Sequence, residues 1–89
     1  MKERYLEVTF RHGQPIAAYY YLPRETHQKS VRTRRVEPGL VIDFTADGQA
    51  IGIEITTPAK VSLAALNAVL GELGHPPATQ ADLAPVLAA

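Results

Sequence analysis

Residues 36–55 read VEPGLVIDFTADGQAIGIEI, a stretch in which two turn signals separate short apolar segments. Pro38-Gly39 fits the central positions of a type II turn, where the second residue needs a positive φ. Asp47-Gly48 is a strong signal for the type I′ turn of a two-residue hairpin loop. The stretch therefore predicts three antiparallel strands in succession, the first of them beginning at Val31.

The two predicted turns also determine which residues lie opposite one another. The first hairpin places Arg34 opposite Asp43, with Arg32 on the same face. The second places Asp43 opposite Gly52, where we expect a bulge or a close approach to the backbone. One face collects large apolar side chains, namely Leu40, Ile42, Phe44, Ile51, Ile53 and Ile55. The other face collects Arg32, Arg34, Val41, Asp43, Thr45 and Glu54. Because both turns give the same division, they predict an antiparallel meander.

Two further strands precede this meander. Residues 5–10 alternate between apolar and polar side chains, and residues 16–22 are rich in tyrosine, both of which are typical of strands. Gly13 supplies the turn between them. A two-residue loop at this turn predicts one shared apolar face, made of Leu6, Val8, Phe10, Ala17, Tyr19 and Tyr21.

A helix is expected beyond the fifth strand. Ser62 is a suitable N-cap, and Gly74 ends the helical pattern before Pro76-Pro77. The apolar stripe of this helix consists of Leu63, Leu66, Leu70 and Leu73. Thr79 and Asp82 resemble a capping box that begins a short apolar tail segment.

These elements predict a single α+β domain over residues 1–89. A five-stranded antiparallel β-meander occupies residues 1–57, and a helical C-terminal segment occupies residues 58–89. We expect the helix to pack on one face of the sheet.

Length and composition exclude several classes of protein. A chain of 89 residues and 9.7 kDa suffices for one core of two layers. It contains no cysteine, which excludes disulfides, thiolate zinc sites and cysteine nucleophiles. Neither a signal peptide nor a stretch long enough to cross a bilayer is recognised, so we expect a cytoplasmic protein without membrane association.

Sequence signals for a cofactor are also missing. The three histidines, His12, His27 and His75, lack the spacing of metal ligands. Neither serine lies in a nucleophile elbow, and no glycine-rich phosphate loop precedes the helix. We therefore expect no metal and no other cofactor.

The zero net charge conceals an uneven distribution. Residues 1–36 carry eight basic and three acidic side chains, a balance of +5, whereas residues 37–89 carry one basic and six acidic ones, a balance of −5. Either the basic and acidic strands pair within the chain, or the dipolar surface attracts an acidic partner or a second copy.

Asp43 and Glu54 are the candidate site residues, because they share the polar sheet face with Arg32 and Arg34. Two carboxylates can perform acid–base catalysis when burial raises the pKa of one of them. An ion-pair ladder worth a fraction of a kcal/mol per pair is the simpler interpretation. We expect a ladder, or a partner-binding surface made from these four residues. A small enzyme that uses Asp43 and Glu54 is the alternative.

Nucleic-acid binding through Arg32, Arg34 and Arg35 is a further alternative, since arginine contacts phosphates and tyrosine stacks on bases. Two expectations oppose it: Arg35 lies on the other face from its neighbours, and Tyr19 and Tyr21 face the core.

The C-terminal segment indicates an interface. The back of the expected helix carries little charge, with Ala64, Ala65, Ala68 and Val69, and the tail is apolar. We expect a homo-oligomer, with a dimer favoured. The alternative is that the tail folds back over its own helix.

The motif around Asp43 also resembles the hallmark of a small prokaryotic family, the domain-of-unknown-function family numbered two-two-eight-three. Its members carry an apolar-apolar-Asp-aromatic step, an Asp-Gly turn and a Gly-Ile-Glu strand. The matching residues here are Asp43, Gly48, Gly52, Ile53 and Glu54. The resemblance is good over residues 31–57 and weaker over residues 5–22.

This resemblance implies a compact β-rich fold and no established activity. Some relatives resemble partners of small toxins, so an antitoxin-like role is one expectation. Taken with the residues, it favours a non-enzymatic module for oligomerisation or for binding a protein partner.

Overall fold

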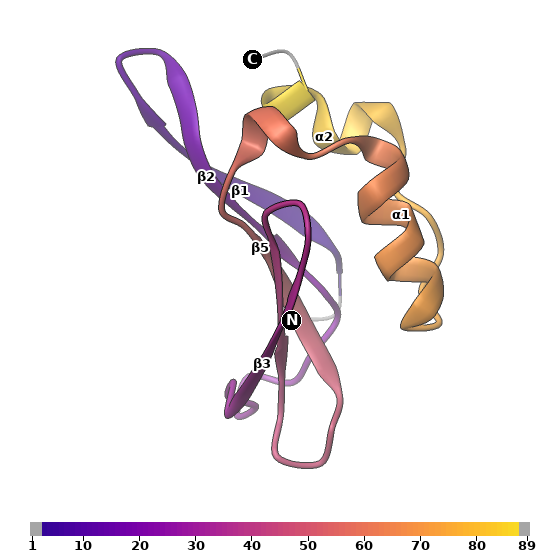
Figure 1. Ribbon diagram of the computed structural model, residues 1–89. Helices are drawn as coiled ribbons and strands as arrows, with labels where there is room; N and C mark the ends of the chain where they lie inside the picture. The colour runs from indigo at the N-terminus through magenta and orange to yellow at the C-terminus, as the bar shows by residue number, and fades with distance from the viewer. Residues whose placement is uncertain (1–2, 88–89) are drawn as a thin grey trace.

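The computed structural model describes residues 3–87 and shows a five-stranded antiparallel sheet with helices over one face (Figure 1). The strands are β1 (Tyr5–Arg11), β2 (Gln14–Tyr21), β3 (Arg32–Val36), β4 (Leu40–Phe44) and β5 (Ala50–Ile55). A short 3₁₀ helix, η1 (Pro58–Lys60), precedes the helices α1 (Leu63–Glu72) and α2 (Gln80–Leu87). The predicted α+β class is confirmed.

The order of the strands differs in part from the predicted meander. β5 rather than β3 lies beside β2, which gives the order β1-β2-β5-β4-β3. Every residue of β5 except Glu54 is buried, whereas the first four residues of β3 are exposed. A mostly buried strand suits the centre of a sheet, and a charged strand suits its edge. The long connection after β2 lets the chain reach that edge.

The hairpin between β3 and β4 corrects the predicted register. Val36 lies opposite Leu40, so three residues rather than two separate the paired positions. This one-residue difference places Arg34 opposite Ile42 instead of opposite Asp43. The arginine therefore shares the face of the core residues, because neighbours across a ladder point to the same side.

The β1–β2 hairpin begins as predicted and then changes register. His12 and Gly13 have φ values of 51° and 76°, which a type I′ turn requires. Beyond the turn, a bulge leaves Ile16 without a partner, so that Tyr20 lies opposite Leu6. The prediction that Tyr19 and Tyr21 share the face of Leu6 was therefore wrong, and Tyr20 takes that place.

Four predicted pairs between β4 and β5 are confirmed, namely Leu40 with Ile55, Val41 with Glu54, Ile42 with Ile53 and Asp43 with Gly52. A second bulge follows, at which Ile51 becomes the extra residue and Phe44 lies opposite Ala50. Gly52 thus lies beside the bulge that its lack of a side chain indicated. The predicted two-residue type I′ turn was wrong: the Thr45 N–H donates to the Gln49 carbonyl across a three-residue loop, and Asp47 has no positive φ.

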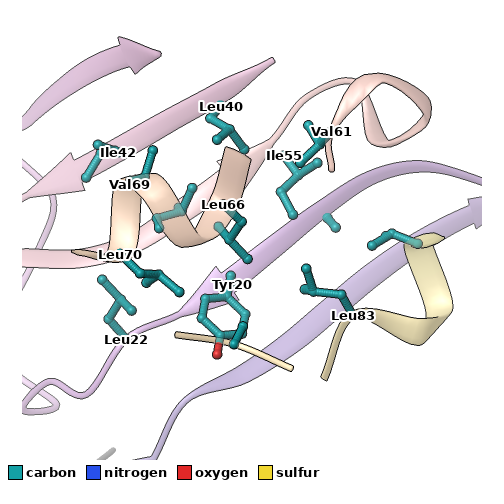
Figure 2. Close-up of a cluster of buried hydrophobic side chains, with 14 of the residues drawn as sticks. Tyr20, Leu22, Leu40, Ile42, Ile55, Val61, Leu66, Val69, Leu70 and Leu83 are labelled. Carbon is teal, nitrogen blue, oxygen red and sulfur yellow. The ribbon is translucent and has the colours of Figure 1, made fainter. Parts of the chain in front are cut away.

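The core lies between the inner face of the sheet and the helices (Figure 2). Its fully buried side chains include Tyr20, Leu22, Leu40, Ile42, Ile53, Ile55, Leu66, Leu70 and Leu83. Val69 also joins the core, so it does not lie on the exposed back of α1 as expected.

Hydrogen bonds hold the two helices in place. Ser62 caps α1 as predicted, its hydroxyl accepting from the Ala65 N–H at 3.1 Å. Thr79 and Asp82 form the predicted reciprocal capping box. Leu83 and Val86 of α2 are buried against the chain's own core, so the tail folds back instead of remaining free.

Candidate functional site

The helices cover only one face of the sheet, and the opposite face is the candidate site (Figure 1). We call it the outer face. The registers place on it Tyr5, Glu7, Thr9, Ala17, Tyr19, Tyr21, Thr33, Arg35, Val41, Asp43, Gly52 and Glu54. All five strands contribute to it, so the positions of its side chains are determined by the sheet itself.

Tyr19 occupies the centre of the outer face. Its hydroxyl donates a hydrogen bond to the Asp43 carboxylate at 2.6 Å, reaching across β5. The ring passes directly over Gly52, where a Cβ atom would lie only 2.1 Å from the Tyr19 oxygen. Gly52 therefore provides the space that allows the tyrosine to reach Asp43. The expected close approach to the glycine is this ring.

The hydrogen bond also fixes the protonation state of the phenol. Burial, and then the hydrogen bond to Asp43, raises the pKa of Tyr19 well above its ordinary value. The hydroxyl thus stays neutral and donates to the carboxylate at physiological pH. Its role in the structure is that of a fixed donor.

Three tyrosines form one cluster on this face, which we call the tyrosine cluster: Tyr5, Tyr19 and Tyr21. Tyr5 and Tyr21 stack with ring centroids 4.5 Å apart, and Tyr19 meets Tyr21 edge-on at 4.6 Å. Arg24 lies over the Tyr21 ring at 5.2 Å from its centroid. Tyr21 also donates a hydrogen bond to Glu7 at 3.2 Å. The cluster already holds one guanidinium group, which shows the chemistry it favours.

The structure separates the four residues predicted as a partner-binding site. Asp43 and Glu54 lie on the outer face, on the neighbouring strands β4 and β5. Arg32 and Arg34 belong to the face that the helices cover, because they lie opposite Phe44 and Ile42. The predicted pairing of Arg34 with Asp43 was wrong.

Arg34 has other partners. It forms an ion pair with Glu72 of α1 at 2.5 Å, and its guanidinium lies 5.9 Å from the centroid of the Phe44 ring. Both side chains of the ion pair are about half exposed, so it contributes little to stability. Arg34 thus connects the edge of the sheet with α1.

Among the described residues, three surface pockets have volumes of about 240–330 Å³, and neither Asp43 nor Glu54 lines any of these three. Within residues 3–87, no group of three His, Asp or Glu side chains is placed to hold a metal ion. Within the same residues, no helix is long and apolar enough to cross a membrane.

Comparison with known proteins finds a family that resembles part of the sheet. The model of the family described as "Protein of unknown function (DUF2283)" matches residues 17–57. The resemblance predicted from the motif around Asp43 is thereby confirmed. No curated protein and no solved structure matches the chain.

The structure gives the motif of the DUF2283 segment a physical meaning. Gly48 has a φ of +88° in the turn between β4 and β5. Asp43 accepts the hydrogen bond of Tyr19, and Gly52 makes room for its ring. The sequence singled out Asp43 and Gly52 but not Tyr19. The signal for Tyr19 was Gly52, because a glycine opposite Asp43 leaves space for a large side chain from the adjacent strand.

Proposed function

We propose that this protein is a non-enzymatic binding module whose outer face receives a basic segment of a partner protein. The tyrosine cluster, lying on a sheet face that the helices leave open, is the observation that carries the proposal. Monomeric domains seldom leave several aromatic rings together on one uncovered face unless that face contacts something.

The charges beside the rings indicate the partner's chemistry. Glu7, Asp43 and Glu54 are interspersed with the tyrosines, and Arg24 shows that a guanidinium fits above a ring. Among the described residues, no hydrogen bond or ion pair engages the exposed carboxylate of Glu54. Lysine or arginine side chains of a partner would combine ion pairs with cation–π contacts here.

The same observations argue against the alternatives. Asp43 accepts the hydrogen bond of Tyr19 and does not line any of the three pockets described above, which does not favour an acid–base pair. The tyrosines do face solvent, which removes one expectation that opposed nucleic-acid binding. The carboxylates beside them would nevertheless repel phosphates, so a basic protein segment is the better fit.

The test is a titration with two synthetic peptides of equal length, one rich in lysine and arginine and the other rich in glutamate, followed by amide NMR shifts. We expect the basic peptide to shift resonances of β2, β4 and β5. Glu54→Gln should weaken binding roughly fivefold, as expected for about 1 kcal/mol lost from one exposed ion pair. Glu72→Gln, which removes a carboxylate from α1, is the matched control and should bind normally.

Other outcomes contradict the proposal. If the acidic peptide or a single-stranded RNA shifts the outer face while the basic peptide does not, the inferred partner chemistry is wrong. If Glu72→Gln weakens binding as much as Glu54→Gln does, the peptide responds to total charge and not to this face.

A further inference from the structure

The second edge strand of the sheet, β1, lacks the protection that β3 has. β3 carries three arginines within five residues, and such charge discourages pairing with another chain. β1 is seven residues long and has only Glu7 and Arg11 as charged residues. Its other residues are mainly aromatic, β-branched or aliphatic, so its free edge is a suitable template for a further strand.

Phe10 is an apolar side chain of this edge strand that the chain leaves uncovered. It is 53% exposed. By the alternation of the strand it lies on the same side as Leu6 and Val8, which pack against the core. Phe10 lies beyond them, near the turn of the β1–β2 hairpin, which projects away from the rest of the chain in Figure 1. A large ring in this position needs a cover that the described residues do not supply.

A pocket of fitting size lies at the other end of the same strand. It has a volume of about 270 Å³ and is lined by Arg4, Tyr5, Leu6 and Tyr20 together with Ala81, Asp82 and Pro85 of α2. A cavity of about 150 Å³ is enough to hold benzene, so a phenyl ring fits in this one. The pocket and Phe10 thus lie four residues apart along a single edge strand.

We propose that two copies of this chain pair through β1 in an antiparallel, two-fold symmetric dimer centred on Val8. In this register Phe10 of each copy lies opposite Leu6 of the other. By the two-fold symmetry, the Phe10 ring of each copy enters the pocket beside α2 of the other copy. The two sheets become one continuous ten-stranded sheet.

The charges select this register over its neighbours. With Val8 at the centre, Glu7 lies opposite Thr9, and Tyr5 lies opposite Arg11, where a cation–π contact is available. Centring on Glu7 would oppose two carboxylates, which is unfavourable. Centring on Thr9 would move Phe10 away from the pocket, opposite Val8.

Overall charge does not oppose the association, because the formal net charge of the chain is zero. The proposed dimer pairs the edge strand β1 and leaves Tyr19, Asp43 and Glu54 of the outer face without contact to the second copy. It therefore stands apart from the proposed binding of a basic segment, and either can fail while the other holds.

Sedimentation of the full chain between about 10 μM and 1 mM tests the dimer, since a single strand pairing buries less area than a standard stable interface. We expect concentration-dependent dimers. Phe10→Ala should weaken them about tenfold or more, as expected for an anchor residue that fills a pocket. Val31→Ala is the matched control, because Val31 is an apolar residue 58% exposed at a different edge of the molecule. It should dimerise like the wild type.

Disulfide trapping tests the register independently, because the chain contains no other thiol. Val8→Cys should oxidise to a covalent dimer at a concentration at which Thr33→Cys, on the opposite edge strand, stays monomeric. A wild type that remains monomeric throughout the concentration range would overturn the proposal. So would dimers that Phe10→Ala leaves unchanged, or equal trapping of the two cysteine variants.

Discussion

Gly52→Ala is the substitution that most directly tests the arrangement at the centre of the outer face. A methyl group at this position would lie 2.1 Å from the Tyr19 hydroxyl oxygen and 2.3 and 2.4 Å from two carbons of its ring. Because such contacts do not occur below 3.0 Å, the ring must retreat by about 1 Å. That retreat breaks the 2.6 Å hydrogen bond between the Tyr19 hydroxyl and Asp43.

The expected magnitude follows from two opposing effects. Losing a hydrogen bond to a charged group costs about 1.5–3 kcal/mol, and replacing a strand glycine by alanine returns about 0.5–1 kcal/mol. Gly52 has no positive φ, so the alanine itself is not strained. We expect a net loss of about 1–2 kcal/mol in the free energy of unfolding, or roughly 5–15 °C in Tm.

A second background makes the test decisive. In Tyr19→Ala the ring is absent, so Gly52→Ala loses nothing and should stabilise the protein by about 0.5–1 kcal/mol. The sign of the effect should therefore reverse between the two backgrounds. Urea unfolding followed by circular dichroism, with the slope m compared among the four proteins, measures it. An equal loss in both backgrounds would refute the role assigned to the ring.

Three further predictions concern other parts of the chain. The Asn67 side chain donates to the Ala78 carbonyl and accepts from the Ala78 N–H. Asn67→Ala should therefore lower the free energy of unfolding by about 1–3 kcal/mol and speed hydrogen exchange of the Ala78 amide. Gln80→Ala should have neither effect. Double-mutant cycles should give a coupling energy below about 1 kcal/mol between Arg34 and Glu72 and no coupling energy between Arg34 and Asp43. The pKa of Tyr19 is raised in the folded state, so the unfolded chain releases this proton first, and stability should fall as pH rises above about 10. Tyr19→Phe should reduce that fall, measured as Tm against pH.

The features that sequence predicted correctly are those with a local physical cause. The Asp47-Gly48 turn needs a residue with a positive φ, and Gly48 supplies it. The caps at Ser62 and Thr79 follow in the same way, from side-chain oxygens that reach nearby N–H groups. Each of these depends on residues within a few positions of one another.

The errors in register come from single residues. The turn between β3 and β4 holds one residue more than a two-residue loop, and Ile16 and Ile51 are extra residues at bulges. Each of them reverses which side chains face the core, because strands alternate with a period of two. Gly52 marks the bulge at Ile51, whereas the bulge at Ile16 has no comparable signal in the local sequence.

The candidate site depends on the same reversal. Asp43 and Glu54 were recognised on one polar face, because the predicted register between β4 and β5 is correct beyond the bulge at Ile51. The arginines were assigned to that face only through the turn at Pro38-Gly39, and the structure moves them away from it. Tyr19 was missed because it reaches the site from β2, whose register relative to β5 no local motif determines.

The bulge at Ile16 has a simple energetic explanation. Only one of the two alternating sets of β2 side chains can face the core, and the two sets differ in the number of phenol groups that they carry. Burying Tyr20 with the small Ala18 places one phenol on the core side, whereas burying Tyr19 and Tyr21 would place two there. Because each buried hydroxyl without a partner costs about 1–3 kcal/mol, the set with a single tyrosine is favoured. The two remaining phenols then face outward, where Asp43 and Glu7 accept their hydrogen bonds. The tyrosine cluster on the outer face is thus a direct consequence of how the core of β2 is filled.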